Sequence, residues 1–168
     1  MKKFIFTLLL SFLTLTMSAQ IQRTFLGNTL GESTYEQVKN NMARKGYRMN
    51  EASDSVYAEF DNIKFSGYDC KKAFFEFYDN KLYFVTFILG QSSQKESLNS
   101  KMEELRTDLT DKYAQYIDTN EDDRISFFDE TTAISTTRSF VKKDNQYIII
   151  FSYMDIKLFQ ESEKSYNE

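Results

Sequence analysis

One pattern occurs twice along this 168-residue chain, and it constrains the fold more than any other feature of the sequence. Ser33-Thr34-Tyr35-Glu36 opens a helical pattern, and Ser93-Gln94-Lys95-Glu96 opens another one 60 residues later. Each helical pattern is followed by an Asp-Asn pair between two apolar segments, at Asp79-Asn80 and at Asp144-Asn145. Self-similarity of this kind is typical of a duplicated supersecondary unit. Because the two Asp-Asn pairs are 65 residues apart, the second unit carries a local insertion.

Both helical patterns start with Ser and continue with Glu three residues later, at Ser33/Glu36 and Ser93/Glu96. This spacing predicts a capping box, in which each side chain binds a free backbone N–H at the helix start. Apolar residues then recur at helical spacing, which predicts one buried stripe on each helix. The stripes are Tyr35, Val38 and Met42 in the first helix and Leu98, Met102, Leu105, Leu109, Tyr113 and Tyr116 in the second.

Segments of alternating polarity follow each helix and predict antiparallel strands. They cover residues 56–61, 73–78 and 82–89 in the first unit and 125–128, 133–141 and 147–154 in the second. A helix and a hairpin cannot bury their apolar faces alone, so we expect the two sheets to join or to pack edge to edge. The predicted fold is α+β, with two tandem helix-plus-antiparallel-sheet units at residues 20–90 and 91–160. We expect the segment after Asp155 to pack for one turn and then fray, with a polar tail at 161–168.

Residues 1–19 have the pattern of a secretory signal peptide. Lys2 and Lys3 precede an apolar run from Phe4 to Leu15, and the small residues Ser18 and Ala19 follow it. The apolar run is shorter than the roughly 20 residues that span a bilayer, which disfavours a membrane anchor. We therefore expect cleavage after Ala19. The mature protein would be secreted or periplasmic and have no integral membrane segment.

The composition limits which partners the protein can bind and how its fold can be stabilised. Without Lys2 and Lys3 the chain holds 19 basic and 25 acidic residues, a net charge of −6. An acidic surface argues against nucleic acid, whose binding depends on neutralising phosphates. The single cysteine, Cys70, cannot form an intrachain disulfide, so the core must hold without one.

The residues that usually carry catalysis are scarce. The chain has no histidine, so the commonest general base is absent, and Cys70 has no histidine to activate its thiol. No pair of carboxylates stands out among the many acidic residues. The sequence therefore predicts a protein that is not an enzyme and has no catalytic residues.

Several short segments resemble one family of exported proteins. They are Phe25-Leu26-Gly27, Lys45-Gly46-Tyr47, Phe65-Ser66-Gly67-Tyr68 and Phe77-Tyr78-Asp79-Asn80-Lys81-Leu82-Tyr83. Together with the capped helices they resemble exported Bacteroides-type proteins with the tandem repeat of β-lactamase inhibitor protein, and the chain is also similar to the small outer-membrane-assembly units of the SmpA/OmlA type. The resemblance implies a fold and the binding of another protein. The chain departs from the inhibitor proteins in its single Cys and lack of Trp, and from the assembly lipoproteins in lacking an N-terminal Cys.

The segment from Asp118 to Asp129 partly matches a calcium-binding loop. Asp118, Asn120, Asp122 and Asp129 place oxygen ligands at positions 1, 3, 5 and 12, and Ile125 stands at the apolar eighth position. Asp123 replaces the glycine of the sharp turn, and Asp129 is shorter than the usual glutamate. The alternative is a solvated acidic turn between a helix and a strand.

The hairpin at Asp79-Asn80 offers a second candidate site. A two-residue turn would place Phe77 opposite Leu82 and Phe75 opposite Phe84. The other face would then present a mixed aromatic and charged patch, a composition typical of recognition surfaces. The predicted partner-binding residues are Phe74, Glu76, Tyr78, Lys81 and Tyr83, with Val85 on the same face. The alternative is that these aromatic residues belong to the core.

The sequence thus favours an exported, non-enzymatic protein that binds a protein partner of unknown identity. Two alternatives stay open: a structural or assembly factor of the cell envelope, and a calcium-dependent binding module. No cofactor other than calcium is expected.

Overall fold

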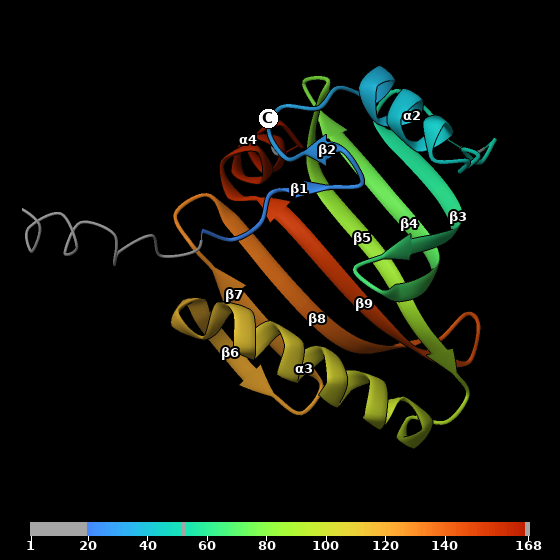
Figure 1. Ribbon diagram of the computed structural model, residues 1–168, viewed down its shortest axis with the longest axis vertical. Helices are drawn as coiled ribbons and strands as arrows, with labels where there is room; N and C mark the ends of the chain where they lie inside the picture. Colours follow the sequence, from blue (N-terminus) through green and yellow to red (C-terminus); the bar gives the residue numbers. More distant parts are fainter. Residues whose placement is uncertain (1–19, 52, 167–168) are drawn as a thin grey trace, which may run out of the picture.

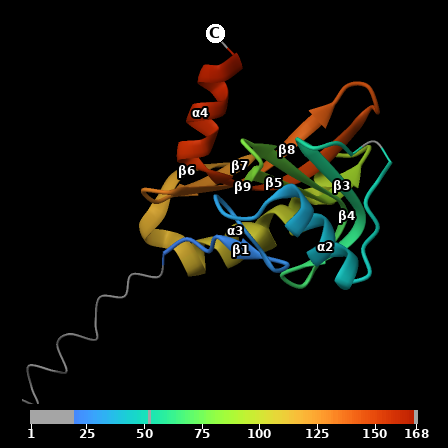
Figure 2. The same cartoon turned by 90° about the horizontal axis from the view of Figure 1, so that it is seen from above.

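The chain forms a mixed α+β structure built on one antiparallel sheet of seven strands (Figure 1). The computed structural model describes residues 20–51 and 53–166, so the predicted signal peptide lies outside the described residues. The strand order is β3-β4-β5-β9-β8-β7-β6. Two helices cover one face of the sheet, and a third rises from the other (Figure 2).

The elements before the centre of the chain are β1 (Thr24–Phe25), β2 (Asn28–Thr29), α2 (Tyr35–Arg44), β3 (Tyr57–Phe65), β4 (Tyr68–Tyr78) and β5 (Lys81–Ser92). Those after it are the 3-10 turn η1 (Glu96–Leu98), α3 (Asn99–Tyr113), the 3-10 turn η2 (Ala114–Tyr116), β6 (Ile117–Glu121), β7 (Arg124–Phe128), β8 (Thr132–Val141), β9 (Gln146–Asp155) and α4 (Ile156–Tyr166). None of the helices in the described part of the chain combines the length and the apolar character needed to cross a membrane.

The first helix starts one residue later than predicted. Thr34 is the N-cap of α2 and forms a capping box with Gln37, in place of the predicted pair Ser33 and Glu36. The Ser33 hydroxyl instead accepts a hydrogen bond of 2.8 Å from the N–H of Thr29. Because Ser33 closes the preceding turn, its neighbour takes the capping role.

The second helix also starts later than predicted, and the capping box of Ser93 and Glu96 is absent. Glu96–Leu98 form the 3-10 turn η1, and α3 begins at Asn99 without a side-chain cap. The predicted buried stripe is confirmed for Met102, Leu105, Leu109 and Tyr113.

The sheet becomes continuous where β5 pairs with β9 at its centre. Eight residue pairs connect the two strands, from Phe84 opposite Met154 to Ser92 opposite Tyr147. The strands that follow α2 therefore lie in one sheet with those that follow α3, as expected from the sequence. One core cluster extends beneath both helices, from Val38 and Met42 of α2 to Leu105 and Leu109 of α3.

Four elements were not predicted from the sequence in their observed form. β6 forms an edge strand where a loop was expected, and β1 and β2 form a small hairpin ahead of the first predicted helix. α4 runs from Ile156 to Tyr166, longer than the single turn expected after Asp155. Leu158 and Ser162 are buried in it, so α4 gains packing beyond its first turn.

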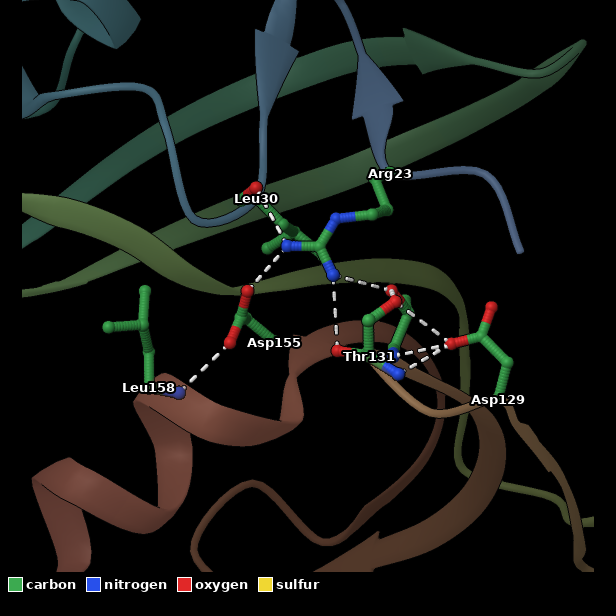
Figure 3. A network of polar contacts seen from close by, with 7 residues as sticks. Arg23, Leu30, Asp129, Thr131, Asp155 and Leu158 are labelled. Atoms are coloured by element: carbon green, nitrogen blue, oxygen red, sulfur yellow. Dashed lines mark hydrogen bonds and ion pairs between the residues drawn. The ribbon is translucent and has the colours of Figure 1, made fainter. Parts of the chain in front are cut away.

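A polar network at one end of the sheet connects the N-terminal segment to the start of α4 (Figure 3). Asp155 pairs with the guanidinium of Arg23 and caps α4 by accepting a 2.9 Å hydrogen bond from the N–H of Leu158. The same guanidinium donates to the carbonyl oxygens of Leu30 (3.0 Å) and Thr131 (3.1 Å). One carboxylate thus fixes segments 132 residues apart in the sequence.

We expect Asp155→Ala to lower the free energy of unfolding by about 2–3 kcal/mol, because α4 loses its cap and Arg23 loses its carboxylate partner. Urea denaturation followed by circular dichroism measures this change. Asp69→Ala is the matched control, since Asp69 pairs with Lys64 where both side chains are at least 80% exposed. Equal effects of the two substitutions would contradict a structural role for the network.

Candidate binding face of the sheet

The two faces of the sheet differ in what covers them. Inward residues of each strand pack under α2 and α3, whereas the opposite face, here called the open face, is bordered at one end by α4 (Figure 2). The open face consists of three cross-strand rows fixed by the strand register. The rows are Lys72–Ile88–Ile150–Thr137–Arg124, Glu59–Phe74–Thr86–Ser152–Ser135–Ser126 and Tyr57–Glu76–Phe84–Met154–Ala133–Phe128.

The chemistry of the open face changes from one edge to the other. Aromatic rings and charges gather on β3 and β4, while small hydroxyl and aliphatic side chains occupy the centre. Phe128 stands at the far side with 52% of its surface exposed. A shallow cavity of about 180 Å³ lies beside it, lined among others by Phe84, Ser135 and Met154.

The predicted partner-binding residues do lie around the β4–β5 hairpin. Phe74, Glu76 and Tyr78 are half-buried on β4, Lys81 is exposed at the start of β5, and Tyr83 is half-buried. Their clustering at this corner of the sheet follows from the two-residue turn at Asp79-Asn80, where both φ angles are positive.

The predicted register is wrong beyond Tyr83. Phe77 does lie opposite Leu82, but a β-bulge between Glu76 and Phe77 shifts the pairing, so that Phe75 faces Val85. Val85 is therefore buried in the core, and Phe84 lies opposite Glu76 on the open face. One extra residue in a strand reverses the faces of all residues that follow it.

Two carboxylates on the open face accept hydrogen bonds from tyrosine hydroxyls. Glu59 is 8% exposed, forms an ion pair with Lys72 and accepts a 3.2 Å hydrogen bond from the Tyr57 hydroxyl. Burial, and then the nearby Glu59 charge, raise the pKa of Tyr57 to about 12. Burial also raises the pKa of Glu76, against the opposing effect of a 3.3 Å hydrogen bond from Tyr83. These charges are fixed in place within an aromatic surface.

Sequence reasoning missed Tyr57, Phe84, Met154 and Phe128 as members of this face. The alternation of Ser126 and Phe128 with Ile125 and Phe127 indicated two faces of a strand, but not which face stays open. Only the strand order brings Phe128 into the same row as Phe84 and Met154.

The segment predicted as a calcium loop forms the β6–β7 hairpin, with Asp122 and Asp123 at its turn. Asp118 accepts hydrogen bonds of 3.0 Å from Thr119 and from Ser126. The side chain of Arg106 on α3 binds the Asn120 side chain and the backbone carbonyl of Asp122.

Asp129 lies after β7 and has a different set of donors. Its carboxylate accepts from the backbone N–H groups of Ile21 (3.0 Å), Thr131 (2.8 Å) and Thr132 (2.8 Å). Within residues 20–51 and 53–166, no group of three or more His, Cys, Asp or Glu side chains is close enough to hold a metal ion. The side chains of Asp118, Asn120 and Asp129 thus accept hydrogen bonds from protein donors, while Asp122 accepts one through its backbone carbonyl.

Comparison with protein-family models, with curated proteins and with solved structures gave no match for the chain.

We expect millimolar calcium to leave the melting temperature unchanged, because protein donors already bind Asp118, Asn120 and Asp129. Differential scanning calorimetry with calcium and with magnesium, as a control for ionic strength, measures this. A saturable heat in a calorimetric calcium titration, together with a calcium-specific rise in melting temperature, would contradict this expectation.

Asp129 is expected to make stability depend on pH. Burial raises the pKa of its carboxyl, but three backbone N–H donors outweigh that effect and hold the pKa below the ordinary value. The ionised form is thus favoured by folding. The stabilisation is present above the unfolded pKa of about 3.9 and is lost as pH falls through the folded pKa.

We therefore expect Asp129→Asn to destabilise the protein at pH 7, and the difference from wild type to shrink as the pH falls below about 4. Urea denaturation at a series of pH values measures the difference. A difference in the free energy of unfolding that stays constant across the pH series would show that the charge of Asp129 does not contribute to stability.

Proposed function

We propose that this chain is an exported binding protein that recognises a protein partner through the open face of its sheet. The observation that carries the proposal is the contrast between the two faces. One face is covered by α2 and α3, whereas the other presents half-buried and exposed aromatic rings in register across β3, β4, β5 and β7. Aromatic residues in a surface of this kind provide contact area at small entropic cost.

The charges of the open face also favour a protein partner. Glu59 and Asp61 pair with Lys72 at one edge, Glu76 stands further along β4, and Arg124 stands at the other edge. A mixed surface suits the polar rim of a protein interface. It does not suit a phosphate backbone, whose binding needs clustered Lys and Arg.

We further propose that the fold arose as a tandem repeat like that of β-lactamase inhibitor protein. The topology supports this view, because α2 precedes β3, β4 and β5 while α3 precedes β6 to β9, and the last strands of the two halves pair at the centre. The extra strand β6 coincides with the insertion inferred from the spacing of the Asp-Asn pairs. In this view, export follows from the leader-like residues 1–19.

The binding test compares two substitutions of equal chemistry on opposite faces. Phe128 lies on the open face at 52% exposure, and Phe140 packs against Tyr147 on the helix side of β8 at 46% exposure. We expect Phe128→Asp to weaken capture of the partner from envelope and culture medium by at least about tenfold, since a charge becomes buried in the interface. Phe140→Asp is expected to capture the partner like wild type.

Pull-down followed by titration of the captured protein measures both effects, and melting curves check that the variants fold. Loss of capture with Phe140→Asp but not with Phe128→Asp would overturn the proposal. Recovery of the wild-type chain in the outer-membrane fraction without a dissociable partner would favour the envelope assembly role instead.

A further inference from the structure

A second, smaller site lies on the helix side of the sheet, beneath α3. It is a pocket of about 170 Å³ between α3, the turn after β3 and strand β9. Its lining residues are Ser66, Tyr68, Leu105, Asp108, Leu109, Lys112, Tyr113, Phe151 and Tyr153. An apolar cavity of about 150 Å³ is large enough to bind benzene, so this pocket has room for one six-membered ring.

The floor of the pocket holds a tyrosine whose hydroxyl has no hydrogen-bond partner among the described residues. Tyr153 is 4% exposed, and its ring is held by Phe25 (4.7 Å between centroids) and Phe151 (4.9 Å). The one fully enclosed side-chain oxygen without a partner in the described part of the chain belongs to Thr136. The Tyr153 oxygen also lacks a partner but is not fully enclosed, so it keeps access to open space. The pocket is the open space that Tyr153 lines.

The charged groups at the pocket already have partners. Asp108 accepts a hydrogen bond from the Tyr68 hydroxyl. The Lys112 ammonium donates to the Gln22 side chain at 3.0 Å and lies 5.0 Å from the centre of the Tyr113 ring. A charged ligand would have to compete with these contacts. A neutral ligand needs only to fill the apolar space and bind the free hydroxyl.

We propose that this pocket binds a small neutral phenol, that is, one aromatic ring with one hydroxyl. The ring would contact Leu105, Leu109 and Phe151, and its hydroxyl would exchange a hydrogen bond with Tyr153. Binding adds a partner to a hydroxyl that folding leaves unpaired, which favours a phenol over an apolar ring of the same size.

The test uses phenol and benzene as probes of the purified protein, with ligand-detected NMR as the readout. Tyr153→Phe removes one oxygen and keeps the ring, and Tyr147→Phe makes the same change on the same strand outside the pocket. Wild type and Tyr147→Phe are expected to bind phenol more tightly than benzene. Tyr153→Phe is expected to bind phenol about tenfold more weakly and benzene unchanged.

Folding and site occupancy have their own controls. Tyr153→Phe is expected to melt no lower than wild type, because the lost hydroxyl has no partner in the described protein. Leu109→Phe fills the pocket and is expected to abolish binding of both probes. Phe128→Asp, on the open face, is expected to leave phenol binding unchanged, which separates this site from the proposed protein interface.

Absence of saturable phenol binding, or equal phenol affinity in wild type and Tyr153→Phe, would overturn the proposal.

Discussion

The pairing of β5 with β9 is the contact on which the rest of the structure depends. Without it the chain would consist of a three-stranded sheet under α2 and a four-stranded sheet under α3, each with two unpaired edges. With it, Phe87 and Phe151 come into register at the centre of the core, and Phe65 stacks on Phe87 at 4.3 Å. The aromatic cluster that results spans both halves, which explains how a chain with one buried cysteine holds its fold without a disulfide.

The same pairing creates the two surfaces that carry the functional proposals. It extends the open face across six strands, so that Tyr57 at one edge and Phe128 at the other belong to a single row. It also places Tyr153 of β9 among the residues that line the pocket beneath α3. A large surface suited to a protein and a small pocket suited to one ring thus lie on opposite faces of one sheet.

The sequence predicted what depends on local periodicity and missed what depends on distant contacts. The α+β class, most strands and the turn at Asp79-Asn80 follow from alternation and turn chemistry, and the structure confirms them. The first capping box was misplaced by one residue because Ser33 binds Thr29 instead of the helix start, and the second is absent because a 3-10 turn precedes α3. The bulge at Glu76/Phe77 moved Val85 into the core, and no local signal marks it. Arg106 and Ile21 bind oxygen atoms of the acidic segment from elsewhere in the chain, and the spacing of that segment does not reveal these contacts.

The central claim is that a protein partner contacts the open face and not the helix side. Photo-crosslinking tests it most directly, with a benzophenone side chain placed at position 128 or at position 140 in the cells that make the protein. We expect a crosslink to one partner protein from position 128 and none from position 140. Crosslinks from position 140 alone, or from neither position nor any other exposed residue of the open face, would contradict it.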